Sequence, residues 1–127
     1  MGFESAAKAI RQQLHDHYSR TPVAWPNASF EPPGRDPWIR LTILGGDGRQ
    51  VATAGQRIRR TGVVVVQVFV PRGSGDGKAW SIAEEVAAIF EASTISGIRF
   101  GAAGTEEVGT QDSWFQINVR VPFDYDE

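Results

Sequence analysis

The segment Arg59–Pro71, RRTGVVVVQVFVP, restricts the fold of this chain more than any other part of it. It contains four successive valines and then Val68, Phe69 and Val70. Because β-branched and aromatic side chains favour extended backbone, this segment predicts a strand from about Ile58 to Val70. Such a long apolar run is typical of a central strand that is covered on both faces for part of its length. We therefore expect a β-sheet built around it.

A glycine-rich stretch, Arg72–Lys78, follows the strand directly. A phosphate-binding loop needs Gly-x-x-x-x-Gly-Lys and then Ser or Thr, so that backbone N–H groups surround the phosphates and a hydroxyl holds Mg²⁺. Here the position five before Gly77 is Arg72, and Ala79 follows Lys78. Both diagnostic positions are wrong, so the stretch is better explained as a turn that leads from the sheet into a helix. We expect the loop from Gly73 to Lys78 to be poorly ordered in the free subunit and not to bind nucleotide.

Two amphipathic helices are predicted. In the first, Phe3, Ala6, Ala7, Ile10 and Leu14 recur at helical spacing, and the helix is expected to end near residues 17–19, before a proline. The second begins with a capping-box pattern, in which Ser81 is followed three residues later by Glu84. Its buried stripe consists of Ile82, Val86, Ile89 and Phe90.

Alternating apolar residues predict further strands over residues 38–44 and 114–123, and a third opens at residues 97–100. The glycines at Gly45–Gly48 have strong turn chemistry, so we expect a hairpin with a short returning strand over residues 50–55. The polar stretch 102–109 is expected to be a loop, and the acidic end 124–127 to be frayed.

The stretch between residues 22 and 37 contains five prolines, which lack the N–H group that a ladder or helix needs. It is expected to be extended and fixed to the surface by Val23, Trp25 and Phe30. The element order predicts an α+β fold in which two α-helices pack on one face of a largely antiparallel or mixed sheet, with residues 1–127 as a single domain. The predicted core consists of Ile10, Leu14, Leu41, Ile43, Val64, Val66, Val68, Val86, Phe90, Ile98, Ile117 and Val119, with Val63 and Val65 as the alternative inward set.

The residues that could carry chemistry are few. The two histidines, His15 and His17, lie two apart on a helix, so their side chains diverge by roughly 200° and cannot share a metal. Cysteine is absent, the acidic pairs 84–85 and 106–107 are adjacent rather than opposed, and no serine has a nucleophile-elbow context. We therefore predict no catalytic, metal or cofactor site. A net charge of −2 argues against a nucleic-acid-binding domain.

The best candidates for an interface are charged residues. Arg57, Arg59 and Arg60 cluster at the start of the long strand. Strand alternation puts Arg57 and Arg59 on one face and Arg60 on the other, so pairing with acidic neighbours is the simpler role and an interface role is the alternative. The candidate interface set is Arg57, Arg59, Arg60, Arg72, Asp76 and Lys78.

Several short motifs in a fixed order carry a resemblance to a known family. They are Pro22–Asn27 with Phe30 and Pro32–Pro33, Pro37–Arg40, Arg60-x-Gly62, Val68–Pro71 with Gly73 and Gly75, and a helix ending in Phe90. In this order they resemble the phage tail terminator-like family, small proteins of long-tailed phages and prophages. The resemblance covers about residues 5–122.

This resemblance implies an α+β fold and a hexameric ring at the head-proximal end of the virion tail, assembled in the host cytoplasm. Such a ring would cap the tail tube, end its polymerisation and offer a surface to the head connector protein. The implied partners are further copies of the chain, the tail tube protein and the head connector, with DNA only passing through the ring and no membrane. The family supplies no catalytic residues. A head–tail connector or another small phage interaction module remains an alternative, as does a minor enzyme of unknown type.

Overall fold

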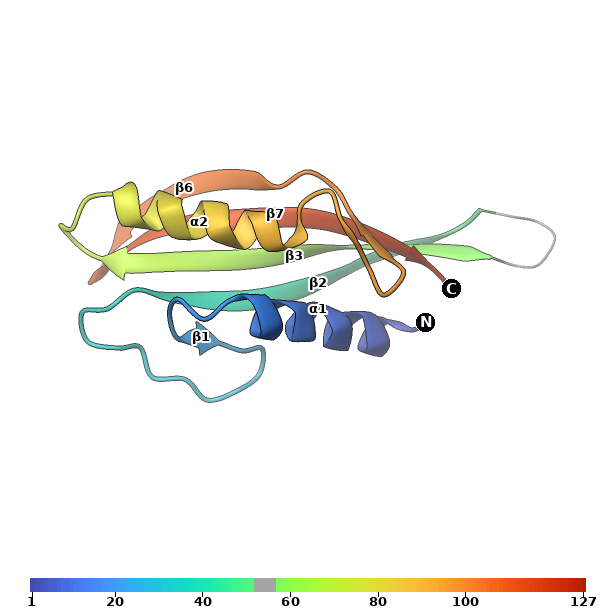
Figure 1. Cartoon of the computed structure of the whole chain (residues 1–127), viewed down its shortest axis with the longest axis horizontal. Helices are drawn as coiled ribbons and strands as arrows, with labels where there is room; N and C mark the ends of the chain where they lie inside the picture. The colour runs from blue at the N-terminus through green and yellow to red at the C-terminus, as the bar shows by residue number, and fades with distance from the viewer. Residues whose placement is uncertain (52–56) are drawn as a thin grey trace.

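The computed structural model describes residues 1–51 and 57–127, so most of the predicted returning strand at 50–55 lies outside the described residues. They form one α+β domain, which confirms the predicted fold class (Figure 1). The elements in chain order are α1 (Phe3–His17), β1 (Val23–Ala24), β2 (Trp38–Gln50), β3 (Ile58–Pro71), α2 (Gly77–Phe90), β4 (Thr94–Ile95), β5 (Ile98–Phe100), β6 (Gly104–Gln111) and β7 (Trp114–Asp126).

The sheet is mixed, with strand order β1-β2-β3-β7-β5-β4 and with β6 also paired to β7. Only the β1–β2 pair is parallel among the described strands. The valine-rich β3 occupies the centre, between β2 and β7, as predicted. β5 and β6 share the other edge of β7: β5 lies opposite residues 123–124, and β6 lies opposite residues 114–120.

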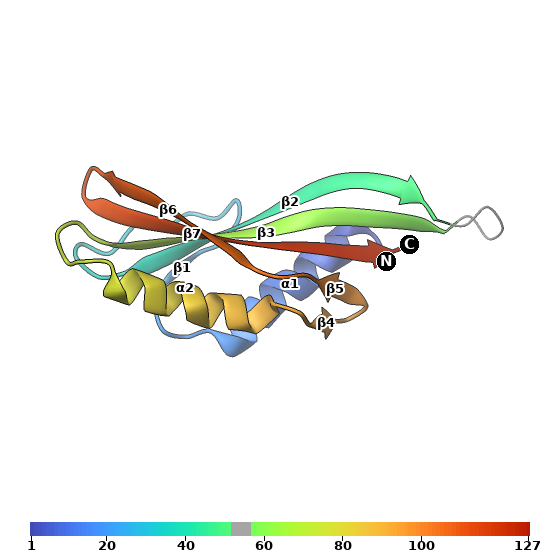
Figure 2. The same ribbon diagram turned by 90° about the horizontal axis from the view of Figure 1, so that it is seen from above.

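The core lies between the sheet and the two helices, which cover the same face (Figure 2). Val64, Val66 and Val68 point toward the helices, so the parity predicted for the valine run is confirmed. All of the predicted core residues are buried except Ile43, which is half-buried because it lies on β2 next to an uncovered edge. The packing therefore agrees with the helical stripes and the strand alternation.

The opposite face of the sheet, which we call the far face, carries a small aromatic cluster. Trp38 stacks on Phe69 with ring centroids 4.1 Å apart, and Phe30 packs on Trp38 at 5.1 Å. Val65 is also buried on this face, although Val64 and Val66 are buried on the helix face. The proline-rich segment is therefore fixed by an aromatic residue, as predicted, and the long strand is covered on both faces for part of its length.

The predicted turn at Gly45–Gly48 is wrong, because β2 continues through these glycines to Gln50. A register shift between Gly45 and Gly48 places one extra residue on β2, which is a β-bulge. A Cβ atom at Gly46 would lie 2.7 Å from Thr61 Oγ1, and one at Gly48 would lie 2.4 Å from Arg60 Nη1. Gly46 is therefore needed for close approach to the Thr61 backbone of β3 and not for a turn, whereas at Gly48 the flexible Arg60 side chain could move aside.

Two further expectations are corrected. Residues 102–109 were expected to be a loop, but β6 pairs with β7 from Gly104 to Gln111. The acidic end was expected to be frayed, but β7 reaches Asp126, and the Glu127 N–H donates to the Ile58 carbonyl over 2.8 Å. β6 is a polar strand at the border of the sheet, where alternation of apolar residues is not required. The acidic end instead continues β7 beside β3 and buries Tyr125.

The start of α2 also differs from the prediction. The helix begins at Gly77 with Asp76 at the N-cap, so Ser81 lies inside it and does not cap it. The hydroxyl oxygen of Ser81 instead accepts a hydrogen bond from Arg20 Nη1 over 2.9 Å. Gly73 and Gly75, with φ of 84° and 83°, make the turn before the helix, and this left-handed backbone favours glycine.

Candidate assembly surfaces

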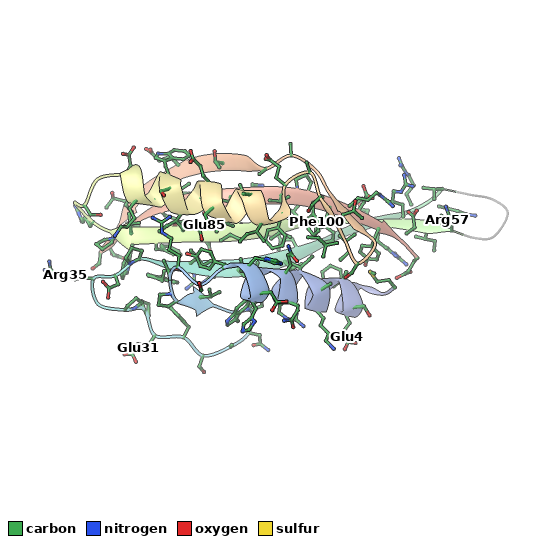
Figure 3. All side chains as sticks on the ribbon, viewed as in Figure 1. Glu4, Glu31, Arg35, Arg57, Glu85 and Phe100 are labelled. Atoms are coloured by element: carbon green, nitrogen blue, oxygen red, sulfur yellow. The ribbon has the colours of Figure 1, made fainter. Side chains whose placement is uncertain are left out.

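The six residues predicted as an interface fall into two groups at opposite ends of β3. Arg57, Arg59 and Arg60 lie at its start, and Figure 3 shows Arg57 far out at the end where β2 and β3 meet. Arg72, Asp76 and Lys78 follow its other end. At ~3.3 Å per residue, the two groups are roughly 40 Å apart. They cannot form one continuous patch within a subunit.

Arg59 and Arg60 are held by the acidic end of the same chain. Arg59 Nε lies 3.0 Å from Asp126 Oδ1 on the far face, and Arg60 Nη2 lies 3.2 Å from Glu127 Oε2. The hydrogen bond from Arg59 lowers the pKa of Asp126, and the same bond raises the pKa of Arg59. Pairing with acidic neighbours, the simpler of the two roles considered, is therefore the one that the structure shows. The pairs do not test an interface role.

The second group has structural roles as well. Arg72 Nη1 donates to the Asp112 carbonyl over 3.2 Å, and the Arg72 N–H donates to the Ser113 carbonyl over 2.9 Å. Asp76 precedes α2, and its carbonyl accepts from the Trp80 N–H over 3.0 Å. Lys78 is exposed and lines a shallow hollow with Arg20 and Asp36.

Residues 1–51 and 57–127 contain no group of three or more His, Cys, Asp or Glu side chains that could hold a metal ion. A hollow beside Gly45 and Gly62 contains one ion pair, in which Arg99 Nε donates to Asp124 Oδ1 over 2.6 Å. His15 is exposed and lies 6.3 Å from the Trp25 ring, measured between ring centroids. No helix in these ranges is long and apolar enough to span a membrane.

The main surfaces that sequence reasoning missed are two edges of the sheet. β1 covers β2 only at Ile39 and Arg40, so residues 41–50 of β2 have no strand on their outer side within the described chain. On the opposite side of the subunit, β6 pairs only with β7 among the described strands, so its outer edge is also open. Figure 1 shows β6 and β2 on opposite sides of the central strands β7 and β3.

Both open edges carry exposed apolar side chains. Of the large apolar side chains described as exposed, Leu44 is 46% exposed on β2 and Val108 is 47% exposed on β6. Phe3, at the start of α1, is 40% exposed, and its ring borders Gly45 on β2, since a Cβ there would lie 3.3 Å from the ring. Exposed apolar side chains at an edge provide apolar surface that a partner can bury.

The β6 edge carries two acidic side chains, and three basic side chains lie near the β2 edge, which also bears the exposed Asp47. Glu106 and Glu107 are exposed on β6. On the other side, Lys8 and Arg11 line a hollow beside α1, and Arg49 is exposed on β2. Within residues 1–51 and 57–127, none of these five side chains forms an ion pair. The only sequence signal for this arrangement was the acidic pair Glu106–Glu107. Its role at an edge was missed because residues 102–109 were predicted to be a loop.

Comparison with known proteins gives one family and one fold. A family model described as "Phage tail terminator protein" matches residues 5–123. Eighteen chains among solved structures match, and one of these, named only by a sequence identifier, is 23% identical with a TM-score of 0.76. That match covers 98% of this chain and 96% of the other. No curated protein matches.

Proposed function

The chain belongs to the phage tail terminator family, and from this premise we propose that it caps the tail tube, ends tube polymerisation and presents the surface to which the head connector joins. It acts as a ring of six copies at the head-proximal end of the tail. The observation that carries this proposal is the family match over residues 5–123. As a member of this family, the chain has a structural role in completing the phage tail.

The structure supports the proposal through its open edges. A ring needs a heterologous interface, in which one patch of a subunit meets a different patch of the next, and closure then fixes the number of copies. β6 and the open part of β2 are two different patches on opposite sides of the subunit (Figure 1). A subunit built this way can bind one neighbour on each side.

Passage of DNA through the ring limits where basic side chains can lie. A duplex carries one negative charge per ~1.7 Å, so a lumen through which it slides should avoid tight basic contacts. Arg59 and Arg60 are already neutralised by Asp126 and Glu127. We therefore expect the side chains of Arg57 and Arg49 to face a neighbouring copy or a partner more than the DNA channel.

The location of the chain on the particle tests this function. Cryo-electron microscopy of tails isolated without heads should show six copies of the chain at one end of the tube, opposite the adsorption tip. Tails from a strain that lacks the gene should lack that density, which is the control. Density on isolated heads, with none on headless tails, would contradict the terminator role and favour the head–tail connector alternative.

A further inference from the structure

We propose that neighbouring copies join by strand pairing, with the outer edge of β6 in one copy against the open edge of β2, residues 41–50, in the next. The inference rests on the proposed ring and names the surfaces that make it. Main-chain groups that point outward from two uncovered edges, Leu41–Gln50 and Gly104–Gln111, become the hydrogen-bonding partners.

The strand directions are compatible with this pairing. β2 and β3, β3 and β7, and β7 and β6 are each antiparallel, so β6 runs opposite to β2 within a subunit. Rotation about a ring axis keeps these directions from copy to copy. β6 of one subunit therefore meets β2 of the next in the antiparallel sense, and the alternation of strand directions continues across the junction.

The two edges are displaced from one another along the strands. Following the register through β7 and β3, β6 lies at the level of Trp38–Thr42 on β2, where β1 covers part of the outer side. A neighbouring β6 must therefore bind toward the far end of β2, shifted by roughly six residues or ~20 Å. A constant shift of this kind is what tilts strands relative to the axis of any closed sheet.

Apolar contact provides the first complementarity. Val108 is the extra residue at the register shift between Glu107 and Gly109, so the edge of β6 presents it as a single apolar projection. Leu44 lies opposite Val63 and is exposed on the far face of β2, whereas Phe3 is exposed on the helix face beside Gly45. Pairing of the edges with this shift brings Val108 to the level of Leu44, so that each of these two side chains loses contact with water.

Opposite charges provide the second complementarity, and they occur on both the far face and the helix face of the sheet. Glu106 lies opposite Asn118 and so points to the far face, as Arg49 does opposite Arg59. Glu107 lies opposite Ile117, which points to the helix face, where α1 carries Lys8 and Arg11. Each glutamate of β6 therefore meets basic residues on its own face of the neighbouring β2 edge. Complementary charges of this kind fix partner and register.

The alternative is that the bulge and the acidic pair only protect β6 from unwanted pairing. Protection does not account for Val108, since a bulge that shields an edge gains nothing from a half-exposed valine at its tip. It also does not account for basic groups on the opposite edge that have no ion-pair partner in the described ranges.

Chemical cross-linking tests the contact directly, because the chain has no cysteine of its own. Leu44→Cys and Val108→Cys chains, mixed in equal amounts, should give a covalent dimer with a short bismaleimide, whereas each alone should give none. A chain with both substitutions should give a ladder of products that ends at the hexamer. Ala88→Cys, exposed on α2, should not cross-link with either and serves as the control.

A charge exchange gives a second, independent readout. Glu106→Lys with Glu107→Lys should abolish copy-to-copy association, and adding Lys8→Glu, Arg11→Glu and Arg49→Glu to the same chain should restore it. Circular dichroism and thermal unfolding report whether each variant folds. Failure of the exchanged chain to associate although it is folded would count against the charge pairing.

The outcomes separate this inference from the proposed ring. The reagent is applied both to concentrated protein and to complete tails. Six-fold density on tails without the mixed product of Leu44→Cys and Val108→Cys, or with a product from Val108→Cys alone, overturns the edge contact and leaves the terminator role intact. The mixed product in concentrated protein, from a chain that is absent from tails, supports the contact and overturns the role.

Discussion

Arg59 donates from Nε to Asp126 Oδ1 over 3.0 Å and so ties the beginning of β3 to the end of β7. Arg99 adds a second contact to the same carboxylate oxygen, over 3.3 Å from Nη2. The two arginines come from β3 and β5, on either side of β7. The acidic end of the chain is therefore an integral part of the sheet, and we expect its charge to contribute to stability.

Removing this charge should change how stability depends on pH. The hydrogen bond from Arg59 holds the pKa of Asp126 below its ordinary value of 3.8. A lowered pKa in the folded state means that the stabilisation is fully present above the unfolded-state pKa and is lost as pH falls through the folded-state value. Asp126→Asn should therefore be less stable than the natural chain at neutral pH, and the difference should vanish in strong acid.

Urea unfolding from neutral pH to strong acid measures this effect. Asp112→Asn is a matched control, because Asp112 is exposed in a turn and its φ of 54° suits asparagine. It should track the natural chain across the whole range. A difference for Asp126→Asn that does not change with pH would show that the carboxylate charge is not what stabilises this end.

Gly62→Ala should destabilise the fold. A Cβ at Gly62 would lie 2.3 Å from Phe123 Cζ and 2.6 Å from the Leu44 carbonyl oxygen, so both neighbouring strands would have to shift. Overpacking of this kind costs ~1–3 kcal/mol, which exceeds the gain of ~0.4–1 kcal/mol from restricting the unfolded chain. Gly34→Ala, with no atom within 4 Å of the new methyl group, should be neutral or slightly stabilising. Denaturant midpoints that rank the two variants in the opposite order would contradict this packing.

The parity of the valine run can be tested with two neighbouring substitutions. Val64 is fully buried on the helix face, whereas Val63 is half-buried on the far face. Val64→Ala loses two buried methyl groups and leaves a cavity, so we expect a loss of about 2 kcal/mol in the free energy of unfolding. Val63→Ala should lose less than half of that. Equal losses in chemical unfolding would mean that the two faces are packed alike.

The central strand and the two helices could be predicted because their patterns depend on burial alone. Val64, Val66 and Val68 alternate along a strand, and Ile10 and Leu14 recur at helical spacing. These patterns can be recognised without knowing where distant segments of the chain lie. The family resemblance came from the same kind of local evidence, and the family match over residues 5–123 confirms it.

The errors occurred where a distant strand decides the structure. Gly46 resembles a turn glycine, but it is required by Thr61, which a local pattern cannot place beside it. The end at Asp126 seemed free because its partner Arg59 lies far back in the sequence. β6 has no apolar alternation because nearly all of its residues are exposed, so its composition is that of a loop. The candidate surfaces were missed for this reason.

Tail length in the absence of the gene tests the central claim most directly. The gene is deleted from an inducible phage genome, and the lengths of the released tails are measured by electron microscopy, with the same strain carrying the gene on a plasmid as control. Our account predicts tails of widely varying, mostly excessive length that do not join heads, and a single sharp length when the gene is restored. Tails of normal, uniform length on intact virions in the deletion strain would contradict it.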